Sequence, residues 1–107
     1  MLKWLLNKSS DLDSSSPRTI SLGNTTGNTI TLMYLREPGT LLWGSDVLPT
    51  YSLSSGSSVS VTIPFNRMDS QYRTDIQLRT SGGITYTKLS QPITHKGTIT
   101  FTGSDKN

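Results

Sequence analysis

The sequence predicts an all-β fold, an antiparallel β-sandwich of the Ig-like or C2-like type with about seven strands. Three observations support this prediction. The chain has 107 residues, a length that fits one domain with one modest core. Ala and Glu are among the strongest helix formers, and the chain contains no Ala and only one Glu. It contains instead 17 Ser and 16 Thr. From residue 19 onward, short runs alternate apolar with hydroxyl or charged side chains, as strands with one buried face do.

Residues 1–18 differ from the rest of the chain. Leu2, Leu5 and Leu6 can line one face of a short helix, and a Ser- and Asp-rich stretch follows up to Pro17. We therefore expect a flexible or short helical N-terminal tail. An isolated helix of this length is marginal in water, so a helical tail would need a surface to dock on.

The strands are expected within residues 19–103, which we assign to the β-sandwich domain, with a disordered C-terminus at 104–107. The alternation in six runs predicts which side chains face the core. These are Ile20 and Leu22; Ile30, Leu32 and Tyr34; Val59, Val61 and Ile63; Tyr72, Thr74, Ile76 and Leu78; Ile84 and Tyr86; and Ile99 and Phe101.

Turn residues separate these runs. Residues 81–83 (Ser-Gly-Gly) predict a tight hairpin, because Gly reaches positive φ without penalty. Residues 37–40 (Glu-Pro-Gly-Thr) predict a type II turn. Residues 40–53 fit neither period, so we expect them to cross between the sheets, with Trp43 and Leu48 closing one end of the core.

The charge and the composition of the chain limit the classes of partner that we expect it to bind. The formal net charge of +3 is spread along the chain without a basic run, so we expect no nucleic-acid partner. The chain has no Cys, which excludes disulfides and thiolate chemistry. We expect no transmembrane segment, because no apolar stretch approaches about 20 residues. A protein or glycan partner is compatible with these properties; the oligomeric state is left open.

Three residues of the irregular stretch are the candidate ligand-binding residues. Trp43 and Tyr51 would form an aromatic platform for a sugar, and core packing is the structural alternative. Asp46 could hold calcium together with Asp69, since both fall in predicted loops. The alternative is that both carboxylates cap turns.

The sequence nominates no catalytic residue, cofactor or metal site. His95 is the single histidine, and no G-x-S-x-G motif accompanies it. We expect it to be an exposed turn residue, and a small hydrolase that uses His95 is the second alternative for the function. The few carboxylates are scattered, so no acid–base pair can be named.

One pattern resembles a family. Asn24-x-Thr26-Gly27, followed by Trp43-Gly44-x-Asp46-x-Leu48 within residues 20–80, resembles small uncharacterised β-sandwich modules of the bacterial envelope or secreted fraction. The resemblance implies the bacterial periplasm or cell surface and no established activity, although a cytoplasmic location is not excluded by the sequence.

Taken together, these features predict a non-catalytic binding or structural module of a bacterial envelope or surface protein. A calcium-dependent or carbohydrate-binding module is the alternative.

Overall fold

The computed structural model describes residues 17–107, and this part of the chain is mostly β. The six strands are β1 (Arg18–Thr25), β2 (Leu32–Arg36), β3 (Ser58–Ile63), β4 (Arg73–Arg79), β5 (Thr85–Pro92) and β6 (Thr98–Thr102). Two single 3₁₀ turns follow strands, η1 (Phe65–Arg67) and η2 (Gly103–Asp105). The β-rich prediction is confirmed, with six strands rather than about seven. The tail predicted at 1–18 lies outside the described residues, apart from its last two positions.

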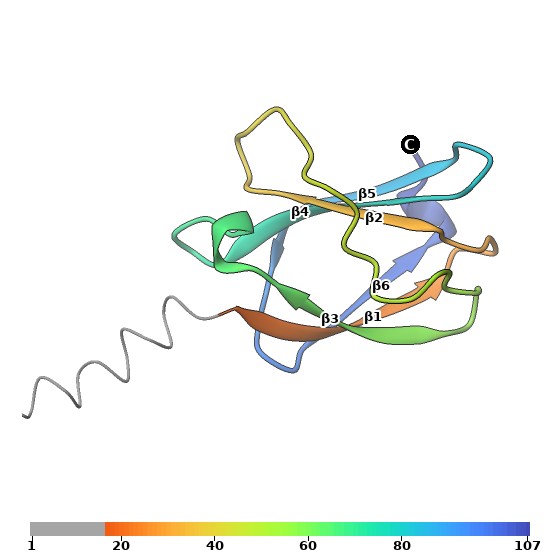
Figure 1. Cartoon of the computed structure of the whole chain (residues 1–107), viewed down its shortest axis with the longest axis horizontal. Helices are drawn as coiled ribbons and strands as arrows, with labels where there is room; N and C mark the ends of the chain where they lie inside the picture. The colour runs from red at the N-terminus through yellow and green to blue at the C-terminus, as the bar shows by residue number, and fades with distance from the viewer. Residues whose placement is uncertain (1–16) are drawn as a thin grey trace, which may run out of the picture.

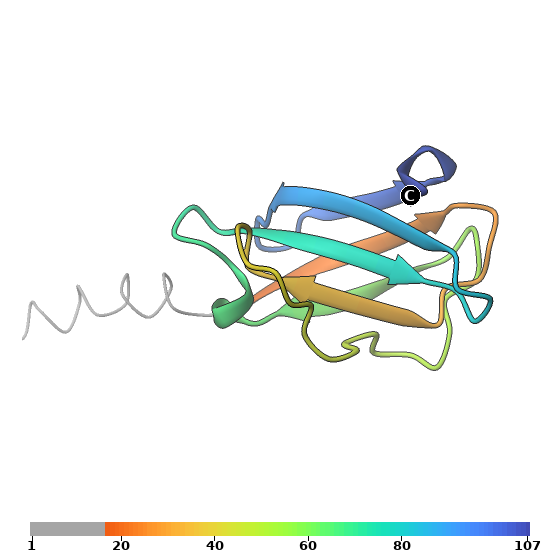
Figure 2. The same cartoon turned by 90° about the horizontal axis from the view of Figure 1, so that it is seen from above.

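The strands form two sheets of three strands each, in the orders β3-β1-β6 and β2-β4-β5, and one sheet lies over the other (Figures 1 and 2). β1 pairs with β3 in antiparallel fashion but with β6 in parallel. The prediction of purely antiparallel sheets is therefore wrong for this pair. A parallel pair needs a long crossover connection, and here nearly the whole domain supplies it between the first and the last strand.

Side chains of both sheets form a single core. The fully or nearly buried apolar residues are Ile20, Leu22, Ile30, Met33, Leu35, Leu53, Val61, Ile63, Met68, Ile76, Leu78, Tyr86, Ile93, Ile99 and Phe101. The predicted core faces of β1, β4 and β6 are confirmed by Ile20 and Leu22, by Ile76 and Leu78, and by Ile99 and Phe101.

The predicted core face of β2 is wrong. Met33 and Leu35 are fully buried, whereas Leu32 and Tyr34 are only half-buried on the other face of the strand. Ile30 is buried as expected, but it lies before β2 and forms an isolated bridge with Leu53. The alternation therefore breaks between Ile30 and Leu32, and the rest of the strand has the opposite phase.

The connection after β2 crosses to the other sheet, as predicted, because it joins β2 to β3. Its backbone first follows the outer edge of β2, where the N–H groups of Gly44 and Val47 donate to the carbonyls of Leu35 and Met33 at 2.9 and 2.8 Å. Leu48 packs against the core as expected. Trp43 does not, and its position is described below.

The other predicted turns are confirmed. Gly83 has φ 91° in the β4–β5 hairpin, where Thr80 N–H donates to the Ile84 carbonyl at 2.9 Å. In the 37–40 turn Gly39 has φ 89°, and Thr40 N–H donates to the Glu37 carbonyl at 3.2 Å.

The C-terminal segment is ordered against β5, contrary to the disorder expected at 104–107. Thr102 and Asp105 form a capping box around η2, with Thr102 N–H donating to Asp105 Oδ2 at 2.8 Å. Lys106 forms a bridge with Tyr86, and Asn107 N–H donates to the Thr85 carbonyl at 3.0 Å. These bonds cover the outer edge of β5.

Candidate binding surface

The β2-β4-β5 sheet presents a polar outer face, and the strand register determines which side chains share it. Residues directly opposite in an antiparallel pair lie on the same face. The pairs on this face are Leu32 with Arg79, Tyr34 with Gln77, Arg36 with Asp75, Gln77 with Thr87, and Arg79 with Thr85. The inverted phase of β2 is therefore what brings Tyr34 and Arg36 beside the polar residues of β4.

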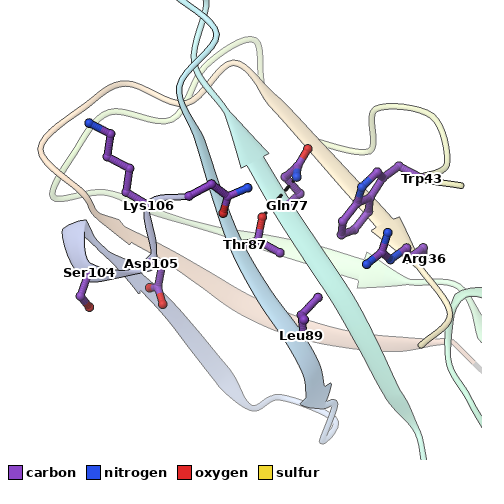
Figure 3. Close-up of a pocket in the computed structure, with 9 residues that line it drawn as sticks. Arg36, Trp43, Gln77, Thr87, Leu89, Ser104, Asp105 and Lys106 are labelled. Carbon is purple, nitrogen blue, oxygen red and sulfur yellow. Dashed lines mark hydrogen bonds between the residues drawn. The ribbon is translucent and has the colours of Figure 1, made fainter. Parts of the chain in front are cut away.

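A shallow depression of about 530 Å³ crosses this face (Figure 3). We call it the outer trough; its lining residues are Arg36, Trp43, Gln77, Thr87, Leu89, Ser104, Asp105, Lys106 and Asn107. Gln77 on β4 and Thr87 on β5 form its floor. Trp43 stands at one side, and the C-terminal segment after β6 stands at the other (Figure 3).

An ion pair anchors one end of the floor. Arg36 Nε donates to Asp75 Oδ2 at 2.8 Å, and the Asp75 side chain is only 4% exposed. The other carboxylate oxygen, Oδ1, accepts the Ser90 N–H at 2.8 Å. Ser90 has φ 50° and lies where the β4–β5 register shifts. The bulge thus aims a backbone donor at Asp75, so that this buried carboxylate has two charge-stabilising partners.

The Trp43 ring covers the guanidinium of Arg36, whose Cζ lies 4.1 Å from the ring centroid. This cation–π contact explains why Trp43 lies on the outer face instead of closing the core, as the sequence had suggested. It also holds the Arg36 side chain between the ring and Asp75.

Side-chain hydrogen bonds fix the rest of the floor. Gln77 Nε2 donates to Thr87 Oγ1 at 3.2 Å, and Gln77 Oε1 accepts from an Arg79 terminal nitrogen at 3.3 Å. The Arg79 Cζ also lies 5.2 Å from the centroid of Tyr34. The amide of Gln77 is therefore held in one orientation across the middle of the trough.

The far wall is held by a second ion pair. Lys88 Nζ lies 3.3 Å from Asp105 Oδ1 and 5.6 Å from the centroid of the buried Phe101 ring. With Arg36 paired to Asp75 and Asp105 paired to Lys88, Lys106 contributes the remaining charge among the lining side chains. The trough is thus close to neutral, and its polar groups are largely fixed before any ligand binds.

The structure does not bring the three predicted ligand-binding residues together. Trp43 lines the trough, whereas Tyr51 is 97% exposed and is absent from its lining. Asp46 Oδ1 accepts the N–H groups of Met33 at 2.9 Å and Leu48 at 3.0 Å. Its carboxylate therefore fastens the crossing connection to β2, which is the turn-capping alternative.

Asp69 has a similar capping role. Its Oδ1 accepts the N–H groups of Gln71 and Arg73, both at 2.9 Å, and the bond from Arg73 is the main cause of a lowered Asp69 pKa. Asp46 bonds to Met33, which lies opposite Leu78 near the end of β4, whereas Asp69 bonds to Arg73 at the start of β4. The two carboxylates therefore lie near opposite ends of this strand. Within residues 17–107 no three His, Cys, Asp or Glu side chains gather as metal ligands do. The geometry thus gives no support to a shared calcium site.

His95 is exposed in the turn before β6, and its Nδ1 accepts the Thr19 N–H at 3.3 Å. The imidazole thus bonds to the backbone of β1 at the start of the domain. This position agrees with the expectation of an exposed turn residue.

The Asn24 motif also has a structural role. Asn24 is fully buried; its Nδ2 donates to the carbonyls of Asn28 and Leu53, both at 2.9 Å. Its Oδ1 accepts from Thr26 N–H at 3.0 Å and from Thr26 Oγ1 at 2.7 Å. The turn after β1 is therefore tied to the end of the crossing connection.

Sequence reasoning missed the residues that form most of the trough, above all Arg36, Gln77 and Thr87. One available signal was the T-x-x-D spacing of Thr102 and Asp105, which resembles a capping box and argues against a disordered end. The cross-strand contacts depend on a register between distant segments, for which the sequence offers no local signal.

A second depression, of about 550 Å³, lies between the 37–42 turn and η1. Leu41 and Leu42 line it but are 88% and 84% exposed. These two apolar side chains are therefore exposed to solvent, so this depression differs from the outer trough, whose lining is mainly polar.

Comparisons with known proteins give the chain no family. No family model matches, and no curated protein matches. A solved structure, an NMR structure of a protein from Eubacterium rectale, is similar at 17% identity with a TM-score of 0.48. The similarity covers 84% of this chain and 88% of that one. No helix among residues 17–107 has the length and apolar character needed to cross a membrane.

Proposed function

We propose that this chain is a non-catalytic binding module, a β-sandwich of the Ig-like or C2-like type, and that the outer trough is its ligand surface. The two three-stranded sheets with one shared core support the sandwich description. The resemblance of residues 20–80 to bacterial envelope modules supports a place in the periplasm or at the cell surface.

The observation that carries the proposal is the fixed polar floor of the trough beside an aromatic wall. Gln77, Thr87 and Arg36 are already held by neighbouring side chains, so a ligand would not have to order them. Such pre-organisation, on rigid strands, is what a binding site requires.

The chemistry of the trough favours a carbohydrate as the ligand. Amide, hydroxyl and guanidinium groups bond well to sugar hydroxyls, and an indole offers an apolar edge to a pyranose ring. Because its two ion pairs are internal, the trough has little net charge to select a strongly charged ligand. We therefore favour a neutral oligosaccharide over a calcium-dependent ligand.

The experiment is isothermal titration calorimetry with neutral soluble oligosaccharides, such as chitotetraose and maltotetraose. Binding should weaken at least about tenfold in Gln77→Ala, because one buried hydrogen-bond partner is worth about 1.4 kcal/mol or more. Tyr51→Ala is the matched control: it removes an exposed aromatic outside the trough and should bind as the unchanged protein does. Binding that Tyr51→Ala abolishes and Gln77→Ala leaves intact would contradict the proposal.

A protein partner is the second candidate, and the exposed Leu41 and Leu42 favour it. Such a partner would cover the depression beside η1 rather than the trough. Leu42→Ser should then weaken capture of that partner while leaving oligosaccharide titrations unchanged. Loss of oligosaccharide binding in Leu42→Ser would show that the two surfaces are not separate.

A further inference from the structure

We propose that two copies of this chain pair through β3, which would join their β3-β1-β6 sheets into one continuous antiparallel sheet. This interaction is independent of the outer trough, because β3 belongs to the other sheet. In the strand order β3-β1-β6, β3 lies at the margin of its sheet.

The hydrogen bonds of β1 show which groups of β3 point outward. Ser21 N–H donates to the Gly97 carbonyl at 2.8 Å, toward β6, so it does not bond to Ser60, the residue opposite on β3. By contrast, Asn24 N–H donates to the Ser57 carbonyl at 3.0 Å. Along an antiparallel pair, residues that bond to the partner strand alternate with residues that do not. The backbone N–H and C=O groups of Ser58, Ser60 and Thr62 therefore point away from β1.

Both edges of the β2-β4-β5 sheet are covered by other parts of the chain, and one outward group of β6 is also taken. Gly44 and Val47 bond to the edge of β2, and Asn107 bonds to the edge of β5. On β6 the N–H of Thr102 is taken by Asp105. Within residues 17–107 no turn or loop backbone bonds to Ser58, Ser60 or Thr62.

β3 also lacks the features that protect an edge strand. Ser58–Ile63 contains no charged residue, no Pro and no bulge. Proteins that avoid edge pairing place Lys, Pro or a bulge in such strands. A bare, uncharged edge of this length is suited to strand addition.

The outer edge of β3 can pair with the same edge of a second copy. We therefore assign a second copy of this chain as the partner strand. A twofold axis at Ser60 sets Ser60 opposite its symmetry mate and Ser58 opposite Thr62 of the second copy. All outward N–H and C=O groups of the three residues then find partners. Val59 falls opposite Val61 of the second copy on the core side, a favourable cross-strand pair, and no like charges meet.

Sedimentation velocity of the full chain as a function of concentration tests this proposal. We expect a dimer that forms at about 0.1–1 mM, the range for a small interface. In Ser60→Lys two like charges would lie opposite each other, so association should weaken at least about tenfold, and added salt should partly restore it. Ser60→Pro removes the outward N–H without affecting a bond to β1, so it should also stay monomeric.

Thr98→Lys is the matched control, because it adds the same charge to an exposed position on β6, at the other margin of the same sheet. It should dimerise as the unchanged chain does. Circular dichroism establishes that each variant is folded. A chain that stays monomeric up to about 1 mM, or dimerisation that Thr98→Lys abolishes and Ser60→Lys does not, would overturn the proposal.

Discussion

Arg36 Nε lies 2.8 Å from Asp75 Oδ2, and these two residues are directly opposite each other on β2 and β4. Their side chains are 22% and 4% exposed. The pair fixes the register of the two strands at one end of the outer trough. It also keeps Arg36 under the Trp43 ring, so the wall of the trough depends on a buried carboxylate beneath it.

Removal of this carboxylate should destabilise the fold. Asp75→Ala leaves Arg36 without its counterion and the Ser90 N–H without an acceptor, which should lower the free energy of unfolding by about 2–4 kcal/mol. Urea denaturation measures the change. Glu37→Ala, at an exposed position directly after β2, should cost less than about 0.5 kcal/mol. Equal effects of the two substitutions would contradict the role given to Asp75.

The turn after β1 should depend strongly on Asn24. Asn24→Ala removes four hydrogen bonds made by a fully buried side chain and leaves the Thr26 N–H without its acceptor, at a cost of about 2–4 kcal/mol. Thermal or urea unfolding can measure it. Asn66→Ala provides the control, because Asn66 is exposed on η1, and should change stability little. A mild effect at Asn24 would mean that the turn does not anchor the crossing connection.

Calcium should not stabilise this protein. The Asp46 and Asp69 carboxylates already accept backbone N–H groups of their own turns, and those turns lie near opposite ends of β4. We therefore expect the melting temperature to stay constant from chelator to millimolar calcium, measured by differential scanning fluorimetry. A rise of several degrees that Asp46→Asn abolishes would contradict this assignment.

Acid should weaken the turn before β4. The backbone bond from Arg73 lowers the Asp69 pKa below its ordinary value, so the folded state favours the ionised carboxyl. This contribution is complete above the unfolded pKa and is lost as the pH falls through the lower, folded pKa. Below about pH 4, stability should thus fall less steeply in Asp69→Asn than in the unchanged protein. Identical acid profiles by urea titration would exclude the effect.

The sequence alone predicts correctly the strands in which the apolar residues alternate clearly and so mark one face. β1 and β6 alternate apolar with hydroxyl residues, and the Gly-Gly turn between β4 and β5 has one plausible geometry. β2 was different, because Leu32, Met33, Tyr34 and Leu35 are all apolar and give no period. Only the contacts of Met33 and Leu35 with the rest of the core decide which pair points inward.

The candidate site is harder to predict from the sequence than the fold, because its residues meet only through tertiary contacts. The sequence points to Trp43 as a binding residue but not to its partner Arg36, because their contact arises from tertiary packing. The sequence is compatible with Asp46 as a ligand and as a turn cap, and only its bond to the distant Met33 separates these roles. The parallel pairing of β1 with β6 likewise joins segments that have no shared local pattern.

β2 turns Met33 and Leu35 to the core and Tyr34 and Arg36 to the outer face of its sheet, where Arg36 lines the trough. The most direct test is the unfolding free energy of Leu35→Ala against that of Tyr34→Ala, both measured by urea denaturation. We predict a loss of about 2–5 kcal/mol for Leu35→Ala, because a fully buried Leu leaves a cavity, and a clearly smaller loss for the half-buried Tyr34. The reverse order would mean that β2 faces the other way and that the trough does not exist as described.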